Sequence, residues 1–152
     1  MSKMDEYLIQ FDEILQWAEA MQKQIFEEGE EIRYMDGLPA KIAGIEDIDK
    51  IRILKVDKII LPDIELVNDL KKANILGASE TAGMALGYAI LLDKNATHDV
   101  LIHEFRHVAQ YELFGDLKSY LTFYLRELIK FGYGNGPLEN DAINFTKLFR
   151  KE

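Results

Sequence analysis

The sequence contains no cysteine, which excludes a disulfide framework and any thiolate metal site. It also lacks an apolar run close to the roughly 20 residues that a membrane-spanning helix needs, so we expect no membrane partner. Acidic residues interrupt the apolar ones throughout MSKMDEYLIQFDEI, the first 14 positions, and this pattern is not that of a signal peptide. These absences favour a cytoplasmic protein.

Basic residues are scarce: 18 Lys and Arg stand against 27 Asp and Glu, for a formal net charge of −9. A nucleic-acid partner is therefore not expected, because phosphate backbones require clustered Lys and Arg. The acidity is concentrated at the N-terminus, where residues 1–31 hold nine acidic side chains and only two lysines. The 152 residues are enough for one domain with its own core.

The N-terminal segment has apolar residues at three- and four-residue steps, from Met4 to Phe26, which predicts an amphipathic helix over residues 4–28. Gly29 and the stretch YMDGLPA then indicate a turn or linker. We interpret residues 1–36 as a helical arm and residues 37–152 as the core of a single domain. Packing of the arm on the core is favoured, and a lid, a pro-segment and a dimer helix are the alternatives.

The rest of the chain predicts an α+β fold with a small mixed sheet. One or two strands are expected in residues 48–62, a helix from Pro62 to Gly77 and a further strand over 84–93. Helices follow at 98–114, with Thr97 as a possible cap, at 116–131 and from Pro137 onward. The strand over 84–93 is either an edge strand, suited to pairing with an extended substrate, or a central strand.

Two of the three histidines lie in the stretch HDVLIHEFRHVAQYE. On a helix, His107 is only about 40° around the axis from His103, so both imidazoles converge on one point at metal-binding reach. Glu104 lies about 100° from His103, beside the pair, where it can accept a proton from a metal-activated water. His98 falls about 220° away and is read as a residue of the helix start.

An accidental HExxH motif is expected on the order of 0.01 times in such a chain, so the motif favours a metal site. The strand shortly before the helix and the apolar residues around the motif support that interpretation. The alternative is a pair of buried or hydrogen-bonded histidines that hold no metal.

The chain from about residue 84 to 142 resembles the zincin metallopeptidases, in which a strand leads into a helix that carries HExxH. The run from GYAILLDKNATHDVLIHEFRHVAQYELFG to FGYGNGPLENDA is similar to a group of small bacterial zincin-like domains. The resemblance implies a small sheet packed on the active-site helix, with His103 and His107 as Zn²⁺ ligands, Glu104 as the base and a glutamate as third ligand, as in gluzincins.

The sequence departs from the usual pattern at two places. Arg106 puts a charge inside the motif where peptidases usually keep an uncharged residue, which weakens the peptidase assignment more than the metal assignment. Gln110 and Leu113 stand where metzincins have a glycine and a third histidine or aspartate, and they exclude that branch. Gln110 comes within about 20° of His103 and is either a polar contact beside the site or an ordinary helix glutamine.

Two glutamates compete for the place of the third ligand. Glu139 follows a glycine-rich break that would let the last helix turn back to the metal, and its neighbours Asn140 and Asp141 can orient ligands. It also matches the similar domains. Glu127, 20 residues after His107, has a spacing that some gluzincins use. We predict Glu139, although an acid in the first turn of a helix also favours the helix dipole.

Catalysis of acyl transfer needs a hydrogen-bond donor for the developing oxyanion, besides the metal. No histidine remains downstream of the motif, so a tyrosine is the natural candidate. We predict Tyr133, in the segment GYGNG, because it also matches the tyrosine of the similar domains. Tyr111, Tyr120 and Tyr124 are more often core residues.

The function expected from the sequence is therefore that of a zinc-dependent metallopeptidase that acts on a peptide or protein substrate with metal-activated water. The alternative is a catalytically silent zincin-like domain that binds metal or a protein partner. Imidazole and carboxylate ligands would also accept manganese, iron or cobalt, so zinc follows from ligand type alone.

Overall fold

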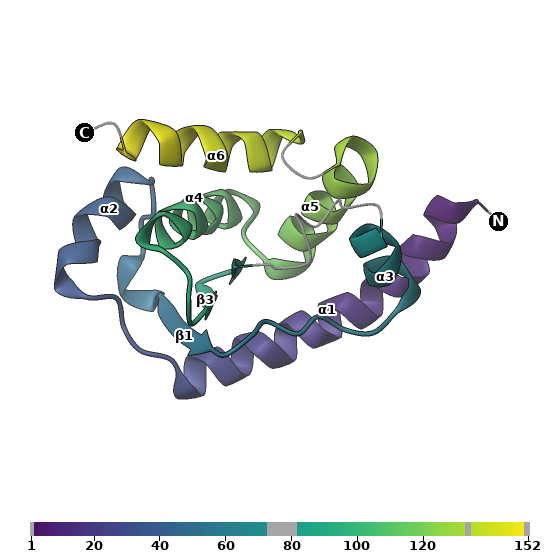
Figure 1. Ribbon diagram of the computed structural model, residues 1–152, viewed down its shortest axis with the longest axis horizontal. Helices are drawn as coiled ribbons and strands as arrows, with labels where there is room; N and C mark the ends of the chain where they lie inside the picture. Colours follow the sequence, from purple (N-terminus) through teal and green to yellow (C-terminus); the bar gives the residue numbers. More distant parts are fainter. Residues whose placement is uncertain (1, 73–81, 133–134, 151–152) are drawn as a thin grey trace.

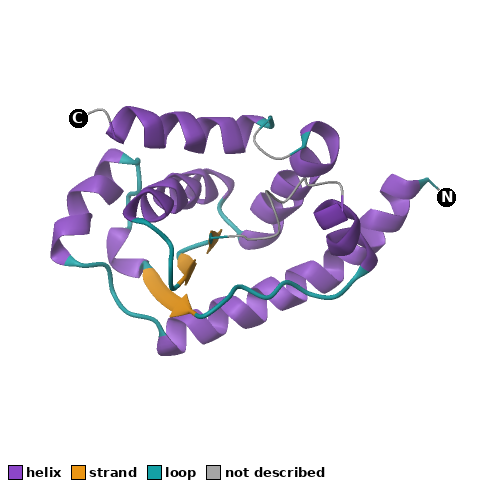
Figure 2. Ribbon diagram, in the orientation of Figure 1, coloured by secondary structure: helices purple, strands orange, loops and turns teal. Residues whose placement is uncertain are grey.

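The computed structural model describes residues 2–72, 82–132 and 135–150. Helices and a small sheet make up the fold (Figure 2). The α-helices are α1 Lys3–Glu28, α2 Gly37–Ile42, α3 Glu65–Lys72, α4 His98–Phe114, α5 Leu117–Phe131 and α6 Pro137–Arg150. The strands are β1 Arg52–Val56, β2 Gly83–Leu86 and β3 Ala89–Asp93, and short 3₁₀ helices span Tyr34–Asp36 and Ile48–Lys50. The mixed, α+β character of the chain is as predicted.

The sheet has the order β1–β3–β2. β1 pairs with β3 in parallel, with Arg52 opposite Ala89, and β2 pairs with β3 in antiparallel, with Leu86 opposite Ala89. β3 is therefore the central strand, and its residues 89–92 are all buried. β2 lies at an edge of the sheet.

The predicted single strand over residues 84–93 is wrong in one respect, because the chain turns back within it. Gly87 and Tyr88 connect β2 to β3 as a two-residue hairpin turn, with Gly87 at a φ of +73°. Such turns need positive φ, which glycine adopts without the steric cost of a Cβ. A side chain would also meet the ring of Tyr111, since its Cβ would lie 3.1 Å from the tyrosine Cζ.

The molecule is layered around this sheet (Figure 1). α1 crosses one face, α4 packs on the other, and α6 lies across α4 on the side away from the sheet. The core between sheet and α4 contains Ile90, Ile102, Phe105 and Val108, all fully buried. These contacts fix the rotation of α4, so that its opposite face is presented to α6.

α1 is the longest helix and begins with a complete capping box, in which Ser2 and Asp5 bond reciprocally. Its buried residues Phe11, Ile14, Ala18 and Ile25 share two apolar cores with the sheet, α3 and α5. The predicted arm therefore packs on the rest of the chain. Charged residues interrupt its apolar ones, and no helix in the described ranges is both long and apolar enough to cross a membrane.

Other predicted elements differ in detail. The short helix α2 occupies part of the expected linker. Its residues Pro39 and Ala40 are buried, and such packing stabilises helices that are too short to form alone. α3 begins at Glu65 rather than at Pro62, and its expected end near Gly77 lies outside the described residues. Thr97 precedes α4, but its side chain makes no capping hydrogen bond with the described residues.

Candidate metal centre

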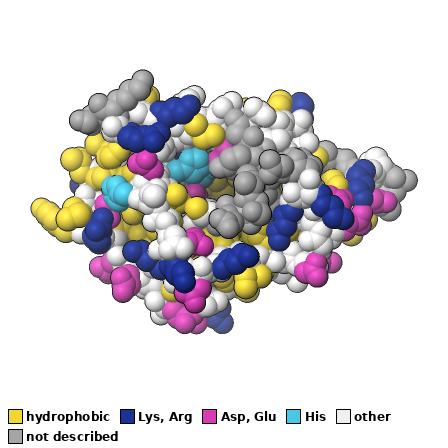
Figure 3. Space-filling model, in the orientation of Figure 1, with side chains coloured by type: hydrophobic (Ala, Val, Ile, Leu, Met, Phe, Trp, Pro, Cys, Tyr) yellow, Lys and Arg dark blue, Asp and Glu magenta, His cyan; other side chains and the backbone are white. Residues whose placement is uncertain are grey.

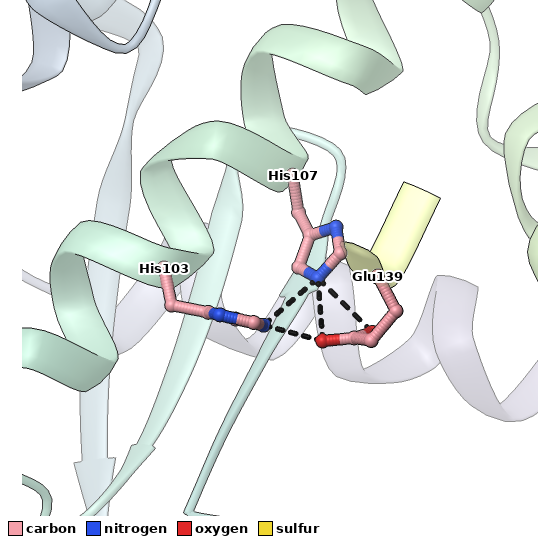
Figure 4. A group of neighbouring side chains, drawn as sticks. All are labelled: His103, His107 and Glu139. Atoms are coloured by element: carbon pink, nitrogen blue, oxygen red, sulfur yellow. Dashed lines mark hydrogen bonds and ion pairs between the residues drawn. The ribbon is translucent and has the colours of Figure 1, made fainter. Parts of the chain in front are cut away.

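The two motif histidines extend from the same side of α4 (Figure 4). The Nε2 atoms of His103 and His107 are 3.2 Å apart. The His107 side chain is almost fully buried, whereas that of His103 is 16% exposed. The one-turn spacing of the motif thus brings both imidazoles together as predicted, with one of them reachable from solvent.

Glu139 completes the group from the first turn of α6, facing the histidines (Figure 4). Its Oε1 lies 2.5 Å from the His103 Nε2 and 3.4 Å from the His107 Nε2. One ligand atom from each residue lies within 4.8 Å of the others, so the group could hold a metal ion. Within the described part of the chain, it is the only such group of His, Cys, Asp or Glu.

The spacing of these atoms can be compared with that of a zinc site. Bonds of about 2.0–2.1 Å at tetrahedral angles place neighbouring ligand atoms about 3.3 Å apart. The distance between the two Nε2 atoms, 3.2 Å, and that from the His107 Nε2 to the Glu139 Oε2, 3.3 Å, agree with this geometry. The 2.5 Å contact between His103 and Glu139 is a hydrogen bond, and an ion would require these two groups to separate by less than an ångström.

The electrostatics of the cluster favour positive charge between its members. Burial lowers the pKa of His107, but the bonds to Glu139 and the charge of Glu104 outweigh it and raise this pKa to about 9. Burial raises the pKa of Glu139, but the bonds to both imidazoles hold it well below its ordinary value. A proton or a metal cation can supply the positive charge.

Gln110 fixes the orientation of the His107 ring. Its side-chain nitrogen donates to the Leu138 carbonyl, at 2.9 Å, and to the carboxylate of Asp141, at 2.9 Å. Both partners are acceptors, so the amide oxygen must face His107, whose Nδ1 lies 2.8 Å away. The Nδ1 therefore carries the proton, and the Nε2 of the neutral ring keeps its lone pair for a metal.

Arg106, the unexpected charge within the motif, points away from the cluster. Its guanidinium donates two hydrogen bonds to Asp141, at 2.8 and 3.1 Å, and one to the Ala43 carbonyl, at 3.0 Å. The arginine is therefore the counter-ion of Asp141. Asp141 in turn accepts a hydrogen bond from Gln110, and the amide oxygen of Gln110 contacts His107. Asp141 lies where its predicted orienting role requires, whereas Asn140 bonds to the backbone of Asn135.

Glu104 lies beside the histidines and is 5% exposed. Burial raises its pKa, an effect that the charges of His107 and His103 partly offset, and the backbone of Ala85 in β2 hydrogen-bonds to its carboxyl group. β2 approaches α4 closely at Gly83, where a Cβ would lie 2.6 Å from a Val100 methyl carbon and 3.3 Å from the Glu104 Cγ. The glycine thus lets the edge strand pack directly against the motif.

Glu127, the rival candidate for third ligand, has another partner. Its Oε1 accepts a hydrogen bond from the Leu138 backbone N–H at 2.9 Å, in the first turn of α6. The first N–H groups of a helix have no partner within the helix, so this carboxylate caps α6 from a neighbouring helix. Glu127 thereby helps to place Glu139 beside the histidines without joining them.

Among the tyrosines, Tyr124 has a role that differs from the predicted one. Tyr133 lies outside the described residues, so its predicted catalytic role has no structural account. Tyr124, which the sequence suggested as a core residue, donates from its hydroxyl to the Glu139 Oε2 at 2.7 Å. Its ring also contacts His107 edge to face, with the ring centres 5.7 Å apart. Tyr120 and Tyr124 lie one turn apart on α5, a spacing that could have indicated a shared face.

Comparison with known proteins gives no relative. No protein-family model, curated protein or solved structure matches the chain. The assignment of a function therefore rests on the residues of the site.

The cluster opens onto a pocket of about 440 Å³. His103, His107, Glu104 and Glu139 form one part of its wall, and residues 82–86, which include all of β2, form another. Much of the remaining wall is apolar and comes from α1, α3 and α5. In Figure 3, histidine side chains reach the surface of the visible face close to hydrophobic ones. A ligand in this pocket can therefore contact both an apolar surface and the cluster of His103, His107 and Glu139.

Proposed function

We propose that the protein is a zinc-dependent metallopeptidase in which His103, His107 and Glu139 bind the metal and Glu104 is the general base. The observation that carries this proposal is the convergence of three ligand atoms within 4.8 Å, with the buried carboxylate of a fourth residue, Glu104, beside them in the same pocket. Three protein ligands with a free fourth position are typical of catalytic zinc sites, whereas structural sites use four.

The metal, when bound, acts as a Lewis acid that polarises a carbonyl group and lowers the pKa of water. Glu104 accepts the proton of the attacking water and passes it to the leaving amine. Glu104 lies beside the two histidines on the helix and not on the face that they share. Its carboxylate would therefore not bind the metal and would remain available for proton transfer. Burial raises its pKa, which makes the carboxylate a stronger base toward the proton of the attacking water.

A peptide substrate is supported by the edge strand β2. The strand lies at the border of the sheet, and all four of its residues line the pocket beside the cluster. An extended peptide can add to such an edge through main-chain hydrogen bonds, which would carry its carbonyl past the metal. Tyr124 already donates to Glu139 and would hold that ligand in place during the reaction.

Metal analysis and a Glu104→Gln variant test the proposal. The purified chain should contain about one zinc per molecule, and a peptide-library digest should show cleavage that a chelator abolishes. Glu104→Gln should retain zinc and lose hydrolysis by several orders of magnitude, since the amide cannot accept the proton. A metal-loaded protein without peptidase activity would support the alternative, a silent metal-binding domain. Equal activity of the variant would refute the role of Glu104.

A further inference from the structure

The pocket of the metal cluster extends away from it into a chamber with apolar walls. This apolar chamber lies between three helices that are far apart in the sequence, α1, α3 and α5. It is lined by Ile14, Trp17, Val67, Leu70, Leu121 and Leu125. α1 therefore contributes to the wall of the pocket as well as to the stability of the fold.

The chemistry of the walls restricts what can occupy the chamber. Among the described residues, the charged ones that line the pocket are Glu104 and Glu139 at the cluster and Asp99, Lys147 and Arg150 near the ends of α4 and α6. None belongs to α1, α3 or α5, so a charged group in the chamber would lose its hydration without gaining a partner. The whole pocket, including the part at the histidines, has a volume of about 440 Å³, within the range of roughly 300–1,000 Å³ of pockets that bind small ligands.

We propose that the apolar chamber receives a large apolar side chain of the substrate, so that the enzyme selects peptides with Leu, Met or Phe next to the cleaved bond. This inference rests on the proposed peptidase function, because the metal must hold the carbonyl while the chamber holds the neighbouring side chain. The helix α1 is then a permanent wall of the substrate site. Complete burial of such a side chain should increase affinity about 10- to 100-fold over glycine.

Metal-binding probes test the chamber without requiring turnover. The full-length, zinc-loaded protein is titrated with the hydroxamates of glycine, leucine and phenylalanine and with octanohydroxamate, since a hydroxamate chelates zinc and is not hydrolysed by it. Leucine and phenylalanine hydroxamates should bind about 10- to 100-fold more tightly than glycine hydroxamate. Equal affinities of the three would overturn the proposal. Tight binding of octanohydroxamate alone would also overturn it and would assign the chamber to an acyl chain.

Two substitutions that change the chamber in opposite directions sharpen the test. Leu121→Trp narrows it and should remove the preference for phenylalanine hydroxamate over glycine hydroxamate. Trp17→Ala widens it and should shift the preference from leucine toward phenylalanine. Ile9→Ala is the control on the same helix, because Ile9 is exposed and lies outside the chamber. Selectivity that stays at the wild-type value in both chamber variants would refute the proposal.

The failure of this inference can be told from the failure of the proposed function. If the protein binds zinc and cleaves peptides whatever their neighbouring side chains are, the proposed function stands and the proposed role of the chamber is refuted. A protein that binds no zinc would lose the function itself, and metal content measured before the titration shows this directly. Should Leu121→Trp fail to fold, as judged by its thermal melting curve, Trp17→Ala alone decides the question.

Discussion

The helix α4 carries histidine–carboxylate contacts at two places along its length, and the two differ in what surrounds them. In the first turn of α4, His98 contacts the buried Asp36 at 2.8 Å, and Arg33 donates to the other oxygen of that carboxylate at 3.0 Å. Farther along the helix, His103 and His107 both face the buried Glu139, whose other described donor is the neutral hydroxyl of Tyr124.

The difference lies in the balance of charge. Asp36 has a permanent positive charge beside it, since arginine remains protonated in proteins, and His98 is half-exposed. Glu139 is buried among two imidazoles and a hydroxyl, none of which carries a permanent charge. The first arrangement is an ion pair that can be complete without a ligand, whereas the second needs a proton or a cation. A contact between one histidine and one carboxylate does not by itself predict a metal site. Two imidazoles that face the same carboxylate, with no permanently charged side chain beside it, favour one.

The largest effect should follow from neutralising the carboxylate of the metal cluster. Glu139→Gln removes a charged ligand and should weaken zinc binding by more than the about 10- to 100-fold loss typical of changes outside the ligand set. Asp36→Asn, beside the start of α4, should leave zinc affinity unchanged. Competition with a chromophoric chelator measures both.

Glu127→Gln is the matched control for that experiment. Its amide oxygen can still accept the hydrogen bond from the Leu138 N–H, so α6 stays capped while the carboxylate charge is lost. Zinc should remain bound with wild-type affinity. Release of zinc by Glu127→Gln together with retention by Glu139→Gln would show that the wrong helix was chosen for the third ligand.

An intermediate effect is expected from Gln110→Ala, which leaves all three ligands in place and removes the acceptor of the His107 Nδ1 proton. Zinc affinity should fall about 10- to 100-fold, as for other residues that orient a ligand. Nitrogen NMR of labelled histidine, recorded above pH 9 where the His107 ring is neutral, should show a mixture of its tautomers in the metal-free variant. The wild type should show the Nδ1–H form alone. A single, unchanged tautomer would contradict the orienting role, whatever happens to the stability.

The smallest effect concerns the ion pair at the start of α4. Burial raises the pKa of Asp36, but the bonds from His98 and Arg33 outweigh it and leave the pKa below its ordinary value of 3.8. A lowered folded-state pKa adds stability above the unfolded pKa, and this stability is lost as the pH falls through the folded-state pKa. Asp36→Asn should therefore cost about 1 kcal/mol or less at neutral pH, because both partners, Arg33 and His98, are largely exposed and solvent screens their charges.

Urea denaturation at neutral pH and at about pH 3 measures this difference. Both proteins are kept metal-free with a chelator, so that the titration of the metal cluster contributes equally to each. The gap in free energy of unfolding between wild type and Asp36→Asn should narrow at the lower pH. A gap that widens on acidification would mean that the sign of the pKa shift is wrong.

The parts of the site that could be predicted from the sequence are those set by local geometry. His103, His107 and Glu104 lie within one helix, where a fixed rotation per residue determines which side chains share a face. The bounds predicted for that helix, 98–114, agree with α4. Glu139 was predicted from its neighbours in the sequence, and its place beside His103 depends on the packing of α6 across α4.

The parts that the sequence left open depend on contacts between distant segments. Tyr124 was read as a core residue because an aromatic at helical spacing is equally suited to packing, and its bond to Glu139 exists only once α5 and α6 meet. The charge of Arg106 looked unfavourable for a peptidase until its partner Asp141, 35 residues away, was placed beside it. The helix α2 was missed because its glycine and proline are local signals for a turn, which burial of its apolar side overrides.

The position of Glu139 on α6 has a consequence for the exchange of a bound ion. An ion held by all three ligands would join α4 to α6, in addition to contacts such as the hydrogen bond from Gln110 to the Leu138 carbonyl, so lifting α6 would remove one of its three ligands. With α6 displaced, only His103 and His107 would hold the ion. We therefore expect the rate of metal loss to depend on the opening of α6, which the hydrogen bond from the Leu138 N–H to Glu127 opposes.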